Sequence, residues 1–430
     1  MAQNKAPQGG VTVKMKPLHM GQQEIYDNLT DRVVCRCGRR FGKSTLFENV
    51  MSRRAITGRK VGWFTPDYKL MRPSFHRMRD ILAPITQSSS RVDALITLWG
   101  GGSVEFWTLD NEDAGRSRDY DDVFIDEASL KKKGLRDIVE QAIMPTLLDR
   151  RGTLSMAGTP KGIDPDNYFY IACTDKSLGF REFYAPTRNN PKLDPIGVAN
   201  LENDFPALVY QQEYLATFVD WSGDAFFSLP TLLTPEGQYW ELPTSCSSVF
   251  ATIDTATKTG REHDGTGVLY LAYQRLPEPR LYLVDYDLVQ IQGNLLETWL
   301  PSVYRRLDEL AAGLRSSNGS SGVFIEDKSS GTILLQQALR RGWMARPIDS
   351  KLTSVGKDER CISISGYVHR RMVRLTKFAH EKQVRYHGQL RNHLEGQVLG
   401  YRIGLENDED DLVDCFSYSV SLGLGNRLGY

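Results

Sequence analysis

The sequence predicts two α/β domains in succession, and three observations support that prediction. A short apolar strand gives way to a glycine-containing loop and then to a helix over residues 32–51. A second apolar strand, within residues 120–128, runs into two consecutive carboxylates. After a proline-containing stretch at residues 228–248, single acids stand instead at the ends of strands and helices. We therefore expect a mostly parallel sheet flanked by helices, followed by a second α/β domain.

The bulk properties are those of a globular protein. A chain of 430 residues, 40% hydrophobic and 25% charged, is long enough for two domains that each bury a core. Its 53 basic and 53 acidic residues cancel, so any nucleic-acid binding must depend on local basic patches. No apolar run is long enough to span a bilayer, and residues 1–16 form a polar, lysine-bearing tail. We expect a cytoplasmic protein with no membrane partner.

The cysteines favour buried thiols over metal ligands or disulfides. None of them belongs to a C-x-x-C pair, and several lie in apolar runs. Two of them alternate on the first predicted strand, where small core or loop residues are expected. The six are Cys35, Cys37, Cys173, Cys246, Cys361 and Cys415.

The first strand, loop and helix predict a phosphate-binding site. Backbone N–H groups of such a loop, and of the helix that follows it, point at an anion. In this pattern Lys43 reaches the β- and γ-phosphates, the Ser44 hydroxyl holds Mg²⁺, and Gly42 and Thr45 flank them. An ordinary turn that opens a helix is the alternative.

One position departs from the general loop pattern. That pattern has a glycine five residues before Gly42, where this chain has Cys37, with Gly38 one place later. Upstream, Gln22 carries a donor and an acceptor on one amide and could match an adenine edge. A glutamine on a helix surface is the alternative for Gln22.

The second signal is the pair of acids at the end of the strand near residue 125. Neighbouring side chains diverge there, so Asp126 can join the Mg²⁺ ligand shell while Glu127 polarises water near the γ-phosphate. An acidic strand end facing solvent is the alternative. A further strand, from residue 152, delivers Thr159 into a Gly/Pro turn, where its hydroxyl could sense the γ-phosphate, although a plain strand and turn would look the same.

Other elements complete the first domain. Residues 60–66 predict a strand ended by Pro66, followed by a helix towards Leu82. Two apolar runs, 95–99 and 103–107, flank three glycines and predict a hairpin. A helix is expected over residues 210–218.

These pieces resemble the ATPase half of the large terminase subunit of tailed double-stranded DNA bacteriophages, the motor that packages genomes into capsids. That family carries a shortened loop of the form Gly-Arg-x-x-Gly-Lys-Ser, which residues 38–44 fit, so the departure at Cys37 favours it. Residues 64–68, 126–128 and 157–160 match as well.

The resemblance implies a P-loop NTPase fold that binds ATP and Mg²⁺. It also implies that Arg39 is an arginine acting in cis in the ATP site. The neighbouring Arg40 is its main rival for that role, and either could be a solvated loop cation.

The second half changes from phosphate-binding to acidic motifs. We predict a flexible tail over 1–16, the first domain over 17–225, a linker over 226–247 and the second domain over 248–430. The predicted elements of the second domain are strands 249–254, 267–271, 281–289 and 323–327, a helix over 295–314, and a helix that begins near 411.

Acids at separate strand and helix ends suit a two-metal phosphodiesterase. Asp254 and Glu326 end predicted strands, and Asp411 and Asp414 lie at i and i+3 at the start of a helix. Such hard oxygen ligands can converge on Mg²⁺ or Mn²⁺. Each acid also has a plain alternative as a turn cap, a strand terminus or a solvated helix start.

The order of these elements resembles the ribonuclease H-like nuclease domain that forms the other half of large terminases. By that resemblance, Asp254, Glu326 and Asp411 match the three metal ligands, with Asp264 and Asp414 as secondary candidates. Asp327 fits less well than Glu326, because adjacent strand residues point to opposite faces.

Between the second and third acids lies a locally basic segment. Over residues 340–385 basic residues outnumber acidic ones about threefold, which predicts contact with the backbone of duplex DNA. No residue pattern reads base edges, so cleavage should be independent of sequence; a solvated basic face is the alternative. The candidates are Lys351, Lys357, Arg360, Arg370, Arg371 and Arg374.

The resemblance spans residues 18–416 and implies a packaging motor. ATP hydrolysis would move viral double-stranded DNA through the portal protein into a procapsid, and the nuclease would cut the concatemer. Further implied partners are a small terminase subunit and a ring of identical subunits on the portal, formed from a monomer in solution. The implied location is the cytoplasm of the infected bacterium, outside the mature virion. One rival is a DNA translocase or helicase whose second domain only binds DNA; another is a nuclease with a non-hydrolysing loop.

Overall fold

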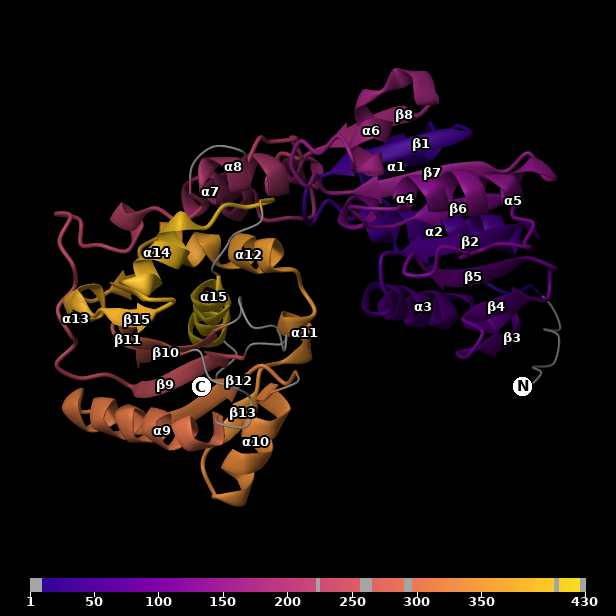
Figure 1. The fold of residues 1–430 in the computed structure, drawn as a ribbon. Coiled ribbons are helices and arrows are strands. Elements are labelled where there is room, and N and C mark those ends of the chain that lie inside the picture. The colour runs from indigo at the N-terminus through magenta and orange to yellow at the C-terminus, as the bar shows by residue number, and fades with distance from the viewer. Residues whose placement is uncertain are drawn as a thin grey trace. The chain divides into compact units, whose positions relative to one another are not determined.

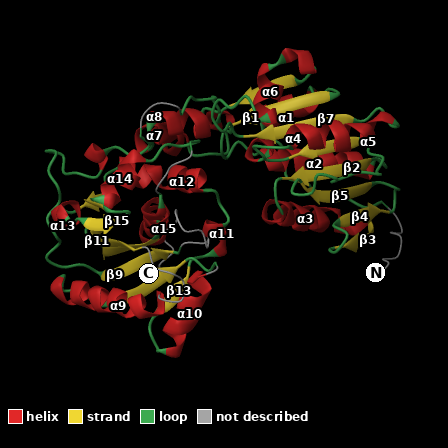
Figure 2. Cartoon of the chain, in the orientation of Figure 1, coloured by secondary structure: helices red, strands yellow, loops and turns green. Residues whose placement is uncertain are grey.

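The computed structural model describes residues 10–221, 225–255, 265–289, 296–328, 330–405 and 410–425. The chain divides into two compact α/β units, drawn in Figures 1 and 2. The first comprises Met1–Glu202 and Ala207–Asp220, and the second Asn203–Pro206 and Trp221–Tyr430. The predicted α/β fold is confirmed: a mostly parallel sheet flanked by helices comes first, and a second α/β unit with a mixed sheet follows.

Within the described residues, eight strands form the sheet of the first unit, in the order β3-β4-β5-β2-β6-β7-β1-β8. Neighbouring strands pair in parallel, except that β4 is antiparallel to both β3 and β5. The pair β4 and β5 is the hairpin that the sequence predicts. The strands are β1 (Arg32–Cys37), β2 (Lys60–Thr65), β3 (Thr86–Ser90), β4 (Leu95–Leu98), β5 (Ser103–Thr108), β6 (Asp122–Ile125), β7 (Thr153–Gly158) and β8 (Arg181–Ala185).

Helices cover both faces of this sheet. On β1, Val33 and Cys35 face a core shared with α2 and α3, while Val34 faces a second core shared with α5 and α6. This near-continuous apolar run is typical of a parallel strand buried on both sides. The helices of this part of the chain are α1 (Met20–Asp27), α2 (Lys43–Ile56), α3 (Tyr68–Leu82), α4 (Leu135–Asp137), α5 (Met144–Leu148), α6 (Tyr168–Thr174) and α8 (Ala207–Val209). Helix α7 (Pro195–Asp204) buries no residue, and its C-terminal end belongs to the second unit.

The strand order brings three loops together. β7 lies between β1 and β6, so the segments that follow these three parallel strands meet at one edge of the sheet. The helix predicted over 210–218 is shorter than expected. It consists of α8 and a π-helical turn, Tyr210–Tyr214, and the backbone then leaves the helical region at Ala216, whose φ is 55°.

The second unit has a sheet in the order β13-β12-β9-β10-β11-β14 within its described residues. β9, β10 and β11 form an antiparallel meander, while β12 runs parallel to β9. The strands are β9 (Ser248–Asp254), β10 (Thr266–Gln274), β11 (Arg280–Val289), β12 (Ser320–Ile325), β13 (Ala345–Pro347) and β14 (Val373–Leu375), with a separate pair β15 (Val384–Tyr386) and β16 (Gln389–Arg391).

Two layers of helices enclose this sheet (Figure 1). α9 and α10 pack on one face through a common apolar core, and α15 crosses the other. On that face the Thr252 hydroxyl lies 2.6 Å from the Ser419 hydroxyl. The helices are α9 (Leu296–Gly313), α10 (Ser330–Arg340), α11 (Ser350–Thr353), α12 (Lys357–His369), α13 (Lys377–Glu381), α14 (His393–Gly400) and α15 (Asp411–Leu424).

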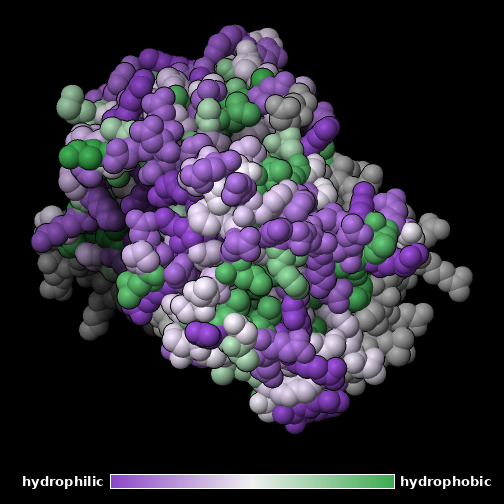
Figure 3. Space-filling view, turned by 90° about the vertical axis from the view of Figure 1, so that its left-hand side faces the viewer, coloured by the Kyte–Doolittle hydropathy of each residue, from purple (hydrophilic) through white to green (hydrophobic). Residues whose placement is uncertain are grey.

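Residues 226–247, predicted as a linker, are hydrogen-bonded to the second unit. The Phe226 amide donates to the Tyr401 carbonyl, and Trp240 exchanges backbone bonds with the segment 375–377. None of the described helices has the length and hydropathy to cross a bilayer. The face drawn in Figure 3 is largely hydrophilic, with its apolar side chains in small separate groups.

A glycine in the second unit provides a test of this packing. A Cβ at Gly331, at the start of α10, would overlap the carbonyl oxygen of Glu326 at the end of β12. We predict that Gly331→Ala lowers the free energy of unfolding by about 1–3 kcal/mol, as overpacking does. Thermal unfolding of the full chain measures it. Gly313→Ala, where a Cβ meets nothing within 4 Å, is the matched control and should not destabilise. Equal stability of the two variants would contradict the packing described.

Candidate nucleotide site and acidic cluster

The loop between β1 and α2 has glycine where the backbone requires it. A Cβ at Gly38 would lie 2.5 Å from the Tyr214 carbonyl oxygen and 2.6 Å from Thr187 Oγ1. Gly42 has a φ of 102°, in the left-handed region that favours glycine. Cys37, at the position of the departure, is still part of β1, and burial raises the pKa of its thiol to about 12. The glycine is therefore needed one place later, where the loop begins.

Side chains at and near helix α1 contact the backbone of this loop. His19 Nε2 lies 2.9 Å from the Phe41 carbonyl, and Gln22 Nε2 donates to the Gly42 carbonyl at 2.8 Å. Gln22 Oε1 accepts from the His19 amide at 3.1 Å, closing a capping box at the start of α1. Gln22 is buried, so it is no surface glutamine, and both ends of its amide are occupied within the protein. Its predicted contact with adenine stays a prediction.

Lys43 is the buried centre of the site. Its Nζ donates to Thr159 Oγ1 at 2.9 Å and lies 3.4 Å from Glu127 Oε1. Thr159 Oγ1 in turn donates to the Cys37 carbonyl at 3.0 Å, which ties the end of β7 to the end of β1. Burial is the largest effect and acts to lower the pKa of Lys43, but Glu127, Cys37 and Asp126 together outweigh it, and the pKa is raised. The ammonium group therefore stays charged, as a phosphate ligand must.

Ser44 and Asp126 meet at hydrogen-bond distance. Ser44 Oγ donates to Asp126 Oδ2 at 2.6 Å, while Asp126 Oδ1 is buried without a hydrogen-bond partner in the described chain. Burial, followed by repulsion from Glu127, raises the pKa of Asp126 to about 7. A hydroxyl beside a buried, unsatisfied carboxylate oxygen is a donor set that suits Mg²⁺.

The remaining predicted residues border this centre. Glu127 adopts a φ of 53° directly after Asp126, so its side chain turns towards Lys43 and is partly exposed. Thr45 is half-buried in the first turn of α2. Arg40 is exposed with a φ of 65°, and its carbonyl accepts from Asn190 Nδ2 at 2.7 Å.

Sequence reasoning missed the residues that hold Arg39. The Arg39 guanidinium is paired with Glu213, whose other carboxylate oxygen lies 3.1 Å from Lys161 Nζ. Lys161 follows Thr159 by two residues and could have been suspected. Glu213 carries no local signal, because only the fold brings it to the loop.

In the second unit Asp254 and Glu326 lie side by side. Asp254 ends β9, and Glu326 follows β12, its parallel neighbour, so both acids lie at one edge of the sheet. Each of the two carboxyl groups shifts the pKa of the other. Burial, and then the charges of Asp414, Glu326 and Asp411, raise the pKa of Asp254 well above its ordinary value.

Basic side chains neutralise this cluster. Lys328 Nζ lies 2.5 Å from Glu326 Oε1, and Lys357 Nζ lies 2.8 Å from Asp414 Oδ2. Arg360 pairs with the other oxygen of Asp414. The described residues include no group of three or more His, Cys, Asp or Glu side chains arranged to hold a metal ion.

The third-ligand candidates divide between described and undescribed parts of the chain. Asp411 and Asp414 lie in the first turn of α15, and their charges help to raise the pKa of Asp254. The secondary candidate Asp264 lies outside the described residues. Lys328 was missed, although it follows Glu326 by two residues.

The basic residues predicted to contact DNA differ in their burial and in their partners. Arg360 is buried against Asp414, so the fold uses it inside the acidic cluster rather than on a surface. Arg374 stacks 3.8 Å from the centre of the Trp240 ring and bonds to Tyr282. Arg370 lies 3.6 Å from Asp204, and Lys357 also faces the acids. Lys351 is exposed, and Arg371 is half-buried.

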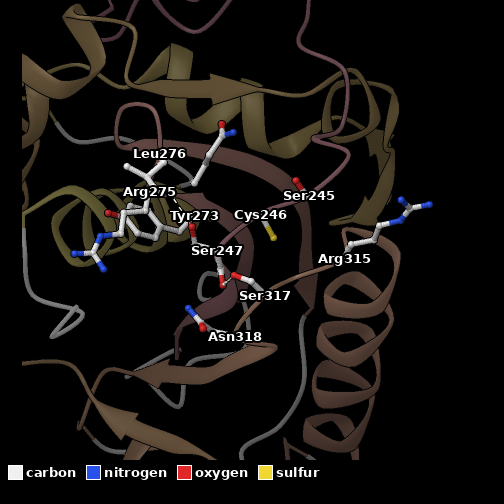
Figure 4. A pocket seen from close by; sticks show the side chains of 10 residues that line it. Ser245, Cys246, Ser247, Tyr273, Arg275, Leu276, Arg315, Ser317 and Asn318 are labelled. Carbon is white, nitrogen blue, oxygen red and sulfur yellow. Dashed lines mark hydrogen bonds between the residues drawn. The ribbon is translucent and has the colours of Figure 1, made fainter.

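A pocket of about 350 Å³ in the second unit is remote from the acids. Its walls include residues 245–247, which precede β9, whereas Asp254 ends that strand. Figure 4 shows Arg275 and Arg315 pointing away from one another at its rim. We assign it no role in the predicted chemistry.

Comparison with known proteins adds a fold-level result. No family model matches this sequence, and no curated protein matches it. A structure of the large terminase from a thermophilic bacteriophage is similar at a TM-score of 0.67 and 13% identity, covering 95% of this chain and 100% of that one.

Two further structures of the same thermophilic phage protein carry nucleotides. Its complex with ADP matches at a TM-score of 0.66 and 14% identity, over 95% of this chain and 100% of that one. Its complex with ATP-gamma-S matches at 0.66 and 13%, over 94% and 99%. The resemblance that the sequence predicted is thus confirmed at the level of fold, and the chain has the fold of a bacteriophage large terminase.

Proposed function

We propose that this protein is the large terminase subunit of a tailed bacteriophage, a DNA-packaging ATPase and endonuclease. The observation that carries the proposal is the meeting of Lys43, Ser44, Asp126, Glu127 and Thr159 at one sheet edge, in a chain whose second unit pairs Asp254 with Glu326. The fold of the thermophilic phage large terminase, solved with ADP and with ATP-gamma-S, supports it.

In the first unit, the proposed ligand is ATP with Mg²⁺. The loop amides and Lys43 would bind the phosphates, while Ser44 and Asp126 would hold the Mg²⁺ that offsets phosphate charge. Glu127 lies beside Lys43 and would orient and polarise the attacking water. Arg39, in the same loop, would stabilise negative charge as a cis-acting arginine. Thr159 bridges Lys43 to the Cys37 carbonyl. Its hydroxyl would therefore sense the presence or loss of the γ-phosphate through Lys43.

In the second unit, the proposed activity is hydrolysis of a phosphodiester bond. Asp254 and Glu326 stand at the ends of neighbouring parallel strands and perturb each other's pKa, which supports their use of one cation between them. Mg²⁺ or Mn²⁺ held there, with Asp411 or Asp414 as the third ligand, would supply an activated water. Three basic side chains, Lys328, Lys357 and Arg360, pair with the acids. When a cation binds, these side chains would either leave the carboxylates or share them with the cation.

DNA, portal protein, small terminase subunit and a ring of identical subunits remain part of the proposal as the expected partners. Host cytoplasm, outside the mature virion, remains the expected location. Among the predicted backbone contacts, Lys351 and Arg370 are exposed and Arg371 is half-buried. A translocase or helicase without cleavage is the second candidate, and the pairing of Asp254 with Glu326 favours the nuclease over it.

The ATPase assignment predicts different defects for two neighbouring side chains. Glu127→Gln should lower the kcat of ATP hydrolysis by about 100-fold or more while the chain still binds ATPγS, because it removes the general base but no phosphate contact. Lys43→Met should abolish nucleotide binding itself. Phosphate release and calorimetric binding on the full chain measure both effects.

The matched control is Glu140→Gln, on an exposed glutamate of the same unit that pairs with Arg136 at 2.9 Å. It should hydrolyse ATP as the unmodified chain does. Hydrolysis by Glu127→Gln at the unmodified rate would contradict the role of Glu127.

The nuclease assignment predicts metal-dependent nicking of supercoiled plasmid by the full chain. Mg²⁺ or Mn²⁺ should support nicking and EDTA should stop it. Asp254→Asn and Glu326→Gln should each reduce it at least about 100-fold, because each removes a cation ligand.

Asp327→Asn is the matched control, since Asp327 adjoins Glu326 but is exposed and accepts from Thr332 Oγ1 at 2.7 Å. It should nick as the unmodified chain does. No nicking with either metal, in a chain that hydrolyses ATP, would favour the translocase.

A further inference from the structure

Three consecutive lysines follow the acids of the proposed ATP site, and the proposed mechanism does not use them. Lys131, Lys132 and Lys133 form the only run of three basic residues in the sequence. The run begins four residues after Glu127, and residues 128–136 contain four basic residues and no acidic one. In a chain with no net charge, this segment is a strong local excess of positive charge.

Both ends of the lysine loop, residues 131–134, are fixed in the first unit. Before the loop, a 3₁₀ turn (Ala128–Leu130) buries Ser129, whose carbonyl accepts from Asn167 Nδ2 at 2.9 Å. After the loop, α4 begins at Leu135, which is 1% exposed and belongs to a core shared with β6 and β7. The loop is therefore a short projection from a fixed base.

The lysines of this loop are accessible. Lys132 and Lys133 are exposed, and Lys131 is half-buried. Among the described residues, neither Lys131 nor Lys133 forms an ion pair. Glu140, an acid on the helical segment that follows, pairs instead with Arg136 at 2.9 Å. Adjacent ammonium groups repel one another, so a bound anion would stabilise the loop.

The backbone of the loop does not offer a site for a small anion. Small phosphates bind where several free backbone N–H groups converge. Here the turn uses its own amides. The Leu130 amide donates to the Glu127 carbonyl at 3.0 Å, and the Lys131 amide donates to the Ala128 carbonyl at 3.2 Å. The contacts available to a ligand are therefore the long lysine side chains, and such flexible point charges suit the spaced phosphates of a nucleic-acid backbone.

The same turn connects the lysine loop to the proposed general base. Glu127 has a φ of 53°, and its carbonyl accepts the Leu130 amide. Ser129 packs closely on β7, since a Cβ at Gly158 would lie 2.8 Å from Ser129 Oγ. An anion held by the loop would thus act on the turn that carries Glu127.

We infer that the lysine loop contacts the phosphate backbone of duplex DNA, independently of sequence. This inference rests on the proposed packaging function and adds to it a DNA contact within the ATPase unit. The sequence analysis placed such contacts only in the second unit, where Arg360 is buried. Each lysine would pair with a phosphate and release a counterion, so the contact should weaken as the salt concentration rises.

The test measures binding of a short fluorescein-labelled duplex to the full chain by anisotropy, in EDTA and over a range of KCl concentrations. Each phosphate contact contributes about 0.9 to the slope of log affinity against log salt. The triple variant Lys131→Gln, Lys132→Gln and Lys133→Gln should flatten that slope by about 2–3 and weaken binding about 100-fold at roughly 0.1 M salt. Two unrelated duplex sequences should show the same loss, because phosphates carry no sequence information.

Matched variants separate the loop from net charge. Arg151→Gln, Lys176→Gln and Arg181→Gln together remove three exposed cations that stand before β7 or at the start of β8, at the opposite edge of the sheet. This control should keep the slope of the unmodified chain. Replacing the three loop lysines by arginine should also keep it, because the charge is retained.

Two further measurements guard against a folding defect. Calorimetric binding of ATPγS shows whether the first unit of each variant is folded. Lys133→Gln alone, at an exposed position, should flatten the slope by about 0.9.

An unaltered slope in both the triple variant and Lys133→Gln, with salt-dependent binding by the unmodified chain, would overturn the inference alone. An equal loss in the opposite-edge control would also overturn it, since net charge rather than the loop would then govern binding. Failure of the unmodified chain to bind duplex DNA at any salt concentration would overturn the proposed packaging function, and the inference with it.

Discussion

The first unit depends on keeping one lysine charged inside the protein. Lys43 is buried, and an ammonium ion without partners would lose its proton there. It keeps the proton because the ends of β1, β6 and β7 meet around it and supply Glu127, Asp126 and the Thr159 hydroxyl. That meeting requires the strand order, with β7 between the other two. The parallel sheet, the glycines of the loop and the support from α1 can all be understood as means of holding this charge where phosphates can reach it.

The second unit, by contrast, gathers negative charge. Asp254 and Glu326 come from parallel neighbouring strands, and α15 brings Asp411 and Asp414 to the same edge. Lys328, Lys357 and Arg360 lie among these acids and limit their repulsion. Arg360 shows how composition can mislead: a residue in a basic stretch is buried as a counter-charge rather than exposed to DNA.

Local motifs were predictable because their physics is local. Consecutive residues form the strand, loop and helix around Lys43, and consecutive residues likewise form the acidic ends of β6 and β9. The position of β7 between β1 and β6 was not predicted, because strand order depends on packing across the whole sheet. Glu213 was missed for the same reason: it lies 174 residues from Arg39. The sequence predicts that the Gln22 amide binds adenine, whereas the fold shows that it donates a hydrogen bond to the Gly42 carbonyl.

One measurement tests the central claim, that a phosphate site and an acidic site each assemble a cation-binding set. Crystals of the full chain soaked with ATPγS and Mn²⁺ would locate manganese by its anomalous scattering. We predict one peak beside Ser44 and Asp126, with nucleotide density at Lys43, and a second between Asp254 and Glu326. Manganese bound elsewhere, or absent from both sites at millimolar concentration, would contradict the account.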